Sequence, residues 1–211
     1  MKEQTKIRIA IADDHTLLRN GLADLIDSFG PFKVVMQADN GIHLLEQLSS
    51  VELLPHICIL DINMPLLDGF GALAQIRKDW PAIKVLALSM FNNEFTIIRM
   101  LRSGANGYLL KNCNPSEFKD ALENIYSFGF YESGATGKGH AVNERVSITP
   151  KEIEFLKLCC SELAYKEIAD KMSISPRTVE DHRDNLFKKL RLNTRMGLVI
   201  YALRCGIATL E

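Results

Sequence analysis

The first 128 residues alternate short apolar runs with amphipathic segments, and this alternation limits the fold more than any other feature of the sequence. The apolar runs occupy residues 7–12, 32–38, 56–61, 83–89 and 107–111. The amphipathic segments occupy residues 15–29, 41–50, 69–79, 93–103 and 115–127. Short runs that are rich in β-branched residues suit strands buried on both faces. Five strand–helix repeats therefore predict an α/β fold, a five-stranded parallel, doubly wound (flavodoxin-like) sheet with helices on both faces.

The pattern changes after residue 128. Residues 129–147 contain four glycines and little periodicity, which is typical of a linker. Beyond them the apolar spacing is helical throughout, over 149–162, 164–172, 176–190 and 194–204. Asn193 or Thr194 is expected to cap the last of these helices. We therefore expect a first domain over 1–128, a linker over 129–147 and an all-α four-helix domain over 148–211.

The composition is that of a soluble globular protein, with 47% hydrophobic and 24% charged residues and a net charge of −1. Residues 148–211 hold 11 basic and 9 acidic side chains, so charge alone gives only a weak indication of nucleic-acid binding. No apolar run approaches the roughly 20 residues of a membrane span, and the N-terminus lacks a secretory pattern. We therefore expect no membrane partner. Five scattered cysteines without metal-ligand spacing favour a reduced, cytoplasmic location.

Polar side chains follow the carboxyl ends of four predicted strands. Asp13 and Asp14 follow the first strand, Asp61 ends the third, Ser89 ends the fourth and Lys111 ends the fifth. In a sheet with the strand order 2-1-3-4-5, these ends meet at one edge, where ligands of open parallel sheets bind. A single Asp-Asp pair after a strand is usually a solvated loop or a helix cap. Four such endings on neighbouring strands instead indicate a site.

These residue types are suited to phosphoryl transfer. Crowded carboxylates repel each other, and Mg²⁺, which prefers oxygen ligands, relieves that repulsion. A carboxylate can then attack a phosphoryl group, while a lysine neutralises the transferred oxygens and a hydroxyl hydrogen-bonds to them. The histidines His15, His43 and His56 are expected at the surface or in helix caps.

Residues 6–128 resemble the receiver domain of two-component response regulators. The resemblance rests on Asp13-Asp14, the segment D-I-N-M-P-L-L-D-G (61–69), Ser89 and Y-L-L-K (108–111). It implies that Asp61 is the phosphoacceptor and that Lys111 pairs with the phosphoryl group. It also implies a switch hydroxyl, a switch aromatic side chain and a set of Mg²⁺ ligands. The switch pair is Ser89 and Tyr108; the ligands are Asp13, Asp14, Asp61 and the backbone carbonyl of Asn63. Tyr108 has a second interpretation, as an ordinary tyrosine at the sheet edge.

The C-terminal half contains two helical segments, 164–172 and 176–190, joined by a short turn. On the second segment Val179, Leu186, Phe187 and Leu190 share one face, and mostly charged residues share the other. This arrangement fits a DNA major groove, although such pairs also occur in proteins that do not bind DNA. Residues 148–210 resemble the LuxR-type helix-turn-helix of the NarL/FixJ class. The resemblance rests on I-T-P-K-E-I-E-F-L (148–156), K-E-I-A (166–169), I-S-P-R-T-V-E-D-H (174–182) and K-K-L (188–190).

This second resemblance implies that segment 176–190 is a recognition helix for double-stranded DNA. The expected phosphate contacts are Lys166, Arg177, Thr178, Lys188 and Lys189. The candidates for base contacts are Glu180, Asp181, Arg183, Asp184 and Asn185. Many members of the class carry basic residues near Glu180 and Asp184, so the acids here predict modest affinity. They can still accept a hydrogen bond from cytosine N4. Arg183 projects towards the apolar side of an ideal helix.

The two resemblances together imply a transcription regulator, not an enzyme, that a sensor histidine kinase phosphorylates. The phosphoryl group is expected to change the face formed by residues 93–127. Such a change would release the DNA-binding domain or promote a homodimer. The last helix, with Leu198, Val199, Tyr201 and Ala202, suits either a dimer contact or packing within the domain. One alternative is a regulator that ignores phosphate and uses the receiver for dimerisation. Another is an enzyme, such as a phosphatase, on the same flavodoxin-like sheet.

Overall fold

The computed structural model describes residues 6–90, 93–131, 147–190 and 192–208. By their contacts, the residues form two compact units, one of residues 1–92 and 103–133 and one of residues 93–102 and 134–211. The helix over 94–102 is therefore described with the second unit, although the sequence pattern assigns it to the first domain. Most of the expected linker lies outside the described residues.

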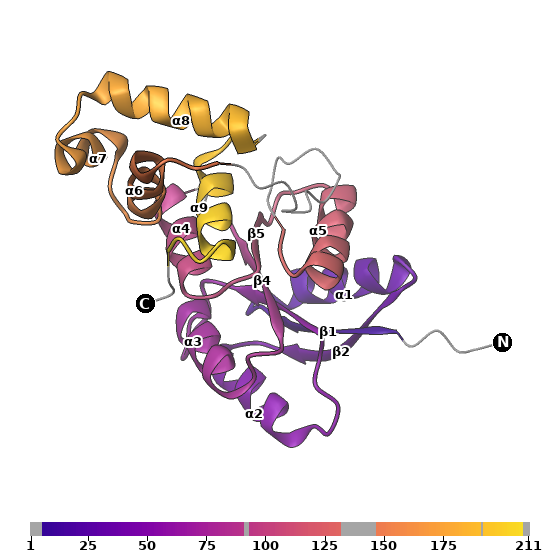
Figure 1. Cartoon of the computed structure of the whole chain (residues 1–211). Coiled ribbons are helices and arrows are strands. Elements are labelled where there is room, and N and C mark those ends of the chain that lie inside the picture. The colour runs from indigo at the N-terminus through magenta and orange to yellow at the C-terminus, as the bar shows by residue number, and fades with distance from the viewer. Residues whose placement is uncertain (1–5, 91–92, 132–146, 191, 209–211) are drawn as a thin grey trace. The chain divides into compact units, whose positions relative to one another are not determined.

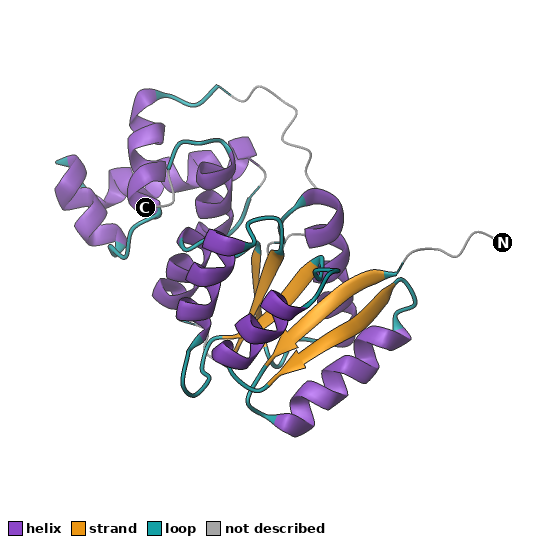
Figure 2. Cartoon of the chain, turned by 90° about the horizontal axis from the view of Figure 1, so that it is seen from below, coloured by secondary structure: helices purple, strands orange, loops and turns teal. Residues whose placement is uncertain are grey.

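The first unit is built on a parallel five-stranded sheet (Figures 1 and 2). Its strands are β1 (Ile7–Ala12), β2 (Phe32–Ala38), β3 (Ile57–Asp61), β4 (Lys84–Ser89) and β5 (Gly107–Leu110). They are hydrogen-bonded in the order β2-β1-β3-β4-β5, with every neighbouring pair parallel. The fold class and the strand order predicted from the sequence are confirmed. The strand order leaves β1, β3, β4 and β5 as successive neighbours, so their carboxyl ends share one edge.

Helices cover both faces of this sheet. They are α1 (Thr16–Ser28), α2 (Gly41–Ser50), α3 (Gly69–Asp79) and α5 (Pro115–Phe128). In Figure 1, α1 and α5 lie on one side of the sheet and α2 and α3 lie on the other. Ile26 of α1 and Phe118 of α5 pack in one apolar core with Ile9 of β1 and Ile59 of β3, all nearly inaccessible to solvent. Residues that alternate along a strand point to opposite faces, which is why strands buried on both sides are apolar throughout.

Three helices of the first unit begin where the sequence supplies a side-chain cap. The side chains of Asn40, Asp68 and Asn114 each accept a hydrogen bond from a backbone N–H in the first turn of α2, α3 and α5. Pro115 follows the cap of α5, where its missing N–H costs nothing. These caps satisfy N–H groups that have no partner inside the helix, so they fix where each helix starts.

The second unit consists of helices. They are α4 (Glu94–Arg102), α6 (Pro150–Cys159), α7 (Tyr165–Met172), α8 (Pro176–Leu190) and α9 (Arg195–Arg204). Their core contains Phe155, Ile168, Leu186 and Leu198, all fully buried. Thr194 caps α9 through a hydrogen bond from the N–H of Gly197 (3.0 Å), which selects Thr194 from the two caps expected.

A buried arginine connects α9 to the end of α6. The guanidinium of Arg195, 6% exposed, donates hydrogen bonds to the backbone carbonyls of Cys159, Ser161 and Leu163. Carbonyls at the end of a helix have no partner inside it, so a cation placed there stabilises it.

Among the described residues, no helix is both long enough and apolar enough to cross a lipid bilayer.

Candidate functional site

The carboxyl ends of the strands bring together the polar side chains that the sequence predicted there. Asp13 follows β1, Asp61 ends β3, Ser89 ends β4 and Lys111 follows β5. The Lys111 ammonium lies 2.7 Å from Oδ2 of Asp61 and 2.8 Å from Oδ2 of Asp13. The two carboxylates and the ammonium are almost fully buried. Segments nearly one hundred residues apart in sequence therefore meet in one charged pocket.

The balance of charges in this pocket is uneven. Burial raises the pKa of Asp61 above its ordinary value; the hydrogen bond from Lys111 lowers it, and the neighbouring charge of Asp13 raises it further. Burial lowers the pKa of Lys111, but its hydrogen bonds to Asp13 and Asp61 raise that pKa above its ordinary value. One ammonium thus serves two buried carboxylates, which leaves the site short of positive charge.

The pocket offers ligands for a divalent cation. Single ligand atoms of Asp13, Asp14, His15 and Asp61 all lie within 4.8 Å of one another. Three of these side chains are carboxylates, two of them buried beside a single ammonium, so the donor chemistry fits Mg²⁺. The backbone N–H of Asn63 points to Oδ1 of Asp61 at 3.4 Å, which places this residue at the rim.

His15 and Arg19 are neighbours of the pocket that the sequence analysis did not assign to it. Nδ1 of His15 lies 2.9 Å from Asp14 and 3.2 Å from Asp13, and the ring is two-thirds exposed. The guanidinium of Arg19 donates to the backbone carbonyl of Asp13. The position of His15 directly after Asp14 is a signal that could have placed it here. Arg19 lies on the first turns of α1, a place that its sequence spacing alone does not reveal.

Ser89 and Tyr108 lie together beside the acids. Both side chains are buried, and their hydroxyl groups are hydrogen-bonded to each other. Burial raises the pKa of Tyr108 above its ordinary value, the hydrogen bond with Ser89 lowers it and the charge of Asp61 raises it. Tyr108 lies on β5, the strand at the edge of the sheet, so its role as the switch aromatic side chain stays a prediction beside its interpretation as an ordinary tyrosine at that edge.

The loop after Asp61 is held in a tight conformation. Leu66 has a φ of 66°, and the N–H of Leu67 donates to the carbonyl of Pro65 (2.8 Å), which forms a three-residue turn that is rare and strained. Gly69 then starts α3 against the backbone of Asp61. A Cβ added at Gly69 would lie 2.4 Å from the Asp61 carbonyl oxygen, so a side chain there would displace the end of β3.

The second site is the helix pair α7 and α8. The turn between them begins at Ser173, which adopts the left-handed conformation (φ 54°). Ser175 caps α8 by accepting a hydrogen bond from the N–H of Thr178 (3.1 Å). Val179 and Leu186 of α8 are buried in the core of the second unit. The opposite face of α8 is exposed, as the helical projection predicted.

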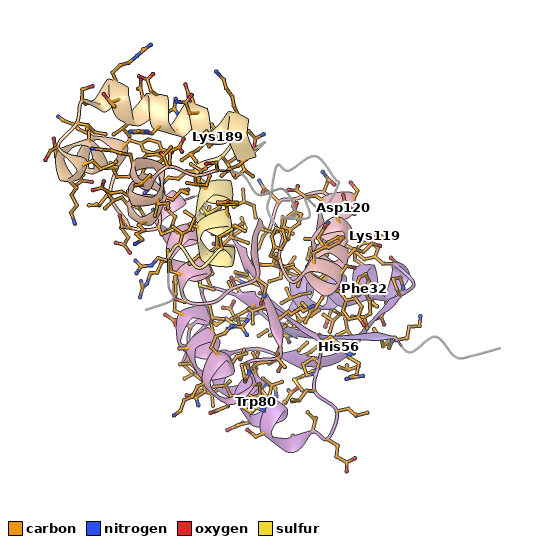
Figure 3. The ribbon with its side chains drawn as sticks, viewed as in Figure 1. Phe32, His56, Trp80, Lys119, Asp120 and Lys189 are labelled. Atoms are coloured by element: carbon orange, nitrogen blue, oxygen red, sulfur yellow. The ribbon has the colours of Figure 1, made fainter. Side chains whose placement is uncertain are left out.

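Most of the predicted DNA contacts lie on exposed surface. The exposed ones are Lys166, Arg177, Glu180, Asp181, Asp184, Asn185, Lys188 and Lys189, and Thr178 and Arg183 are half-buried. Three of the cations have acidic partners within the unit, and the pair of Arg177 with Asp181 is the loosest of them, at 3.9 Å. Arg183 pairs with Asp184, and the ammonium of Lys189, labelled in Figure 3, lies 2.8 Å from both carboxylate oxygens of Glu152. No signal in the sequence pattern suggested this Lys189–Glu152 pair.

The last helix packs largely within its own unit. Leu198, Val199 and Ala202 are fully buried in the core, and Tyr201 is half-buried at its edge. These three residues therefore pack within the second unit, which includes α4, and packing within the predicted helical domain alone stays a prediction. A dimer contact through Tyr201 stays a prediction.

The fold, the acidic pocket and the helix pair together define a two-domain response regulator. Residues 9–123 match the family model described as "Response regulator receiver domain". Residues 146–202 match the model described as "Bacterial regulatory proteins, luxR family". The chain belongs to the response regulators with a LuxR-type DNA-binding domain, a family of transcription regulators.

Curated relatives and solved structures agree with this assignment. The chain is 34% identical over 217 residues to the "Transcriptional regulatory protein MctR" of Rhizobium johnstonii, with 99% of each chain covered. It is 31% identical to the "Oxygen regulatory protein NreC" of Staphylococcus aureus, over 94% of this chain and 97% of that one. A two-component response regulator of the LuxR family from Aurantimonas is similar in structure, with a TM-score of 0.56 and 27% identity. That similarity covers 60% of this chain and 88% of the Aurantimonas chain.

Proposed function

We propose that a sensor histidine kinase transfers a phosphoryl group to Asp61 and that this transfer controls binding of α8 to promoter DNA. The observation that carries the proposal is the ion pair of Asp61 with Lys111 at the shared edge of the sheet, beside a second buried carboxylate. A carboxylate that lacks full charge compensation is prepared to receive a cation and a phosphoryl group.

The transfer is a substitution at phosphorus. A carboxylate oxygen of Asp61 forms the new P–O bond, and the P–N bond of the phosphohistidine breaks, with its electron pair returning to the imidazole. Lys111 stays within reach of the transferred oxygens and neutralises part of their charge. Asp13, Asp14, Asp61 and the carbonyl of Asn63 would hold Mg²⁺, which supplies further charge neutralisation for the transfer.

The signal leaves the pocket through Ser89 and Tyr108. A phosphoryl group on Asp61 offers new acceptor oxygens to the Ser89 hydroxyl, which now bonds to Tyr108. A hydroxyl that turns towards the phosphate ends its present hydrogen bond with Tyr108 and thereby alters the packing of the aromatic ring. Because Tyr108 lies on β5, the movement of its ring is transmitted to β5 and to the residues that follow this strand in the chain.

DNA binding rests on the exposed face of α8. We propose that Lys166, Arg177, Thr178, Lys188 and Lys189 contact phosphates and that base contacts come from Glu180, Asp181, Arg183, Asp184 and Asn185. Lys189 reaches a phosphate only by exchanging its bond to Glu152, so its contribution is expected to be smaller than that of Lys188. A homodimer would place two such helices on paired half-sites.

A DNA-binding titration with the full chain tests the proposal. Fluorescence-labelled genomic fragments are titrated with wild type and with Asp61→Asn, each with and without acetyl phosphate and MgCl₂. We expect phosphorylation to tighten binding of wild type and to leave Asp61→Asn unchanged. Tight binding that is identical in all four conditions would favour a regulator that ignores phosphate and would contradict the proposal.

A further inference from the structure

The exposed face of α8 contains two acid–arginine pairs that differ in how firmly they are held. Arg177 Nε lies 3.9 Å from Asp181, and both side chains are largely exposed, at 83% and 61%. Such a pair is worth little and leaves both groups mobile. Arg183 and Asp184 form the second pair at 2.9 Å, and the arginine side chain is only 30% exposed. The second pair therefore has a defined geometry.

The guanidinium of Arg183 also contacts an aromatic ring. It lies 5.7 Å from the ring centroid of Tyr165, at the start of α7. The guanidinium of the buried Arg195 lies 5.2 Å from the centroid of the same ring. Arg195 itself is anchored by the carbonyls at the end of α6. The buried Arg195 thus holds the ring of Tyr165, and the cation–π contact with that ring holds Arg183 in one place on the surface.

Arg183 uses only one oxygen of its acidic partner. Its Nε and Nη2 both lie 2.9 Å from Oδ1 of Asp184. The second oxygen, Oδ2, keeps its capacity to accept a hydrogen bond, because a carboxylate has acceptor sites on both oxygens. Projected at 100° per residue, Asp184 lies on the side of α8 opposite the buried Val179 and Leu186. The acid is thus oriented, partly neutralised and directed outwards.

The chemistry of an acceptor-only group selects one base in the major groove. Guanine presents two acceptors and thymine one, and a carboxylate is repelled by both bases. Adenine presents an amino donor beside the N7 acceptor, which opposes the carboxylate. Cytosine presents its N4 amino group and no acceptor of its own, and the adjacent acceptor, O6, belongs to the paired guanine. A fixed carboxylate at the groove face therefore favours cytosine over the other three bases.

We propose that Asp184 determines base specificity by accepting a hydrogen bond from a cytosine N4 amino group through Oδ2. Arg183, counted above among the candidates for base contacts, acts instead as the positioning residue that orients Asp184. The inference rests on the proposed DNA binding by α8 and names the base that it recognises. Because Arg183 partly neutralises the acid, Asp184 can approach the phosphate-lined groove at a smaller electrostatic cost than an unpaired carboxylate.

Binding-site selection from a randomised DNA duplex pool tests this inference with the phosphorylated full chain. We expect wild type to select a C·G pair at one position of each half-site, and replacing that pair to weaken binding about tenfold. Asp184→Asn is expected to select A·T there, because an amide can both donate to adenine N7 and accept from N6. The matched control Asp170→Asn, at an exposed acid of α7 with no proposed DNA contact, is expected to retain cytosine.

The positioning role of Arg183 is tested in the same selection. Arg183→Gln is expected to weaken the preference for cytosine several-fold, and Arg183→Lys is expected to restore part of it because the charge returns without the two-pronged geometry. An Asp184→Asn variant that selects the wild-type sequence would overturn the base assignment. An Arg183→Gln variant with full cytosine preference would overturn the positioning role. A wild type that selects no sequence at all would instead overturn the proposed function.

Discussion

Two buried carboxylates in this protein each pair with a lysine at nearly the same distance, yet their pKa values shift in opposite directions. Asp61 lies 2.7 Å from Lys111 in the pocket, and Glu152 lies 2.8 Å from Lys189 in the helical unit. The two acids are 3% and 4% exposed. Yet the pKa of Asp61 is raised, chiefly by burial, whereas burial of Glu152 is outweighed by its hydrogen bonds and its pKa is lowered.

The neighbours of each pair explain the difference. Glu152 accepts hydrogen bonds from the N–H and the hydroxyl of Thr149 and lies in the first turn of α6, where the helix dipole favours an anion. Asp61 instead shares its lysine with a second buried carboxylate, Asp13. The first arrangement is complete and stabilises the fold. The second is left incomplete, which is expected where a protein must bind a further charge.

Removal of the shared lysine is expected to have the largest effect on stability. Lys111→Met leaves Asp13 and Asp61 buried without a cation, and loss of one partner from a buried ion pair costs about 3–5 kcal/mol. We expect hydrogen exchange in β1 and β3 to accelerate accordingly. Adding Mg²⁺ is expected to slow exchange more in Lys111→Met than in wild type, because the cation replaces the lost charge. Equal protection in the two proteins without Mg²⁺ would contradict this interpretation of the pocket.

A smaller loss is expected when the complete pair is broken. Glu152→Gln removes the charge that holds Lys189 and weakens the cap of α6, and such contributions amount to about 1–2 kcal/mol. The effect should be confined to hydrogen exchange in α6 and α8. Glu154→Gln is a control, since Glu154 lies on the same helix outside the cap. Wild-type protection of α6 in Glu152→Gln would show that the pair contributes nothing to stability.

Neutralising Asp61 in the pocket is expected to stabilise the fold, unlike the two substitutions above. Asp61→Asn removes the repulsion from Asp13 and leaves Lys111 with one carboxylate, so we expect a gain of up to about 1 kcal/mol. The measurement is hydrogen exchange in β1 and β3 without Mg²⁺. A loss of stability in this variant would mean that Asp61 is a structural acid like Glu152.

The smallest expected effect is the dependence of stability on pH, and it has opposite signs for Glu152 and Asp61. The pKa of Glu152 in the folded state lies below its ordinary value of 4.5, so its contribution is present above that value and is lost as the pH falls through the folded pKa. The pKa of Asp61 lies above its ordinary value of 3.8, so its ionisation destabilises the fold and protonation relieves that cost as the pH falls. Hydrogen exchange of both variants against wild type should show the loss in Glu152→Gln and the gain in Asp61→Asn shrinking together towards low pH. A difference that grows instead would reverse the sign assigned to that acid.

The sequence predicted the sheet and the pocket more fully than the surface of the helical unit. Strand order and strand ends determine that Asp13, Asp61 and Lys111 meet, because parallel strands present their carboxyl ends at one edge. The pairing of Glu152 with Lys189 joins residues 37 apart through tertiary packing, which periodicity does not report. The direction of Arg183 depends on Tyr165 of another helix in the same way.

The sequence predicted the order of the helices and strands more accurately than the residues at which each begins and ends. Helices α2, α3 and α8 match the expected ranges, while α6 ends at Cys159 and not at residue 162. His56, expected at the surface or in a cap, is half-buried, and its Nδ1 accepts the N–H of Arg8 (2.9 Å) just before β3 begins. The expected linker, 129–147, has too few regularly spaced apolar residues for its sequence to predict a conformation.

The most direct test of the phosphoacceptor pocket is the intact mass of the full chain after incubation with acetyl phosphate. With MgCl₂, wild type is predicted to gain the mass of one phosphoryl group, in a bond labile to hydroxylamine, and to gain none when a chelator is present during the incubation. Asp61→Asn is predicted to gain none. A phosphoryl group that persists on Asp61→Asn, or that forms equally without a divalent cation, would contradict the account.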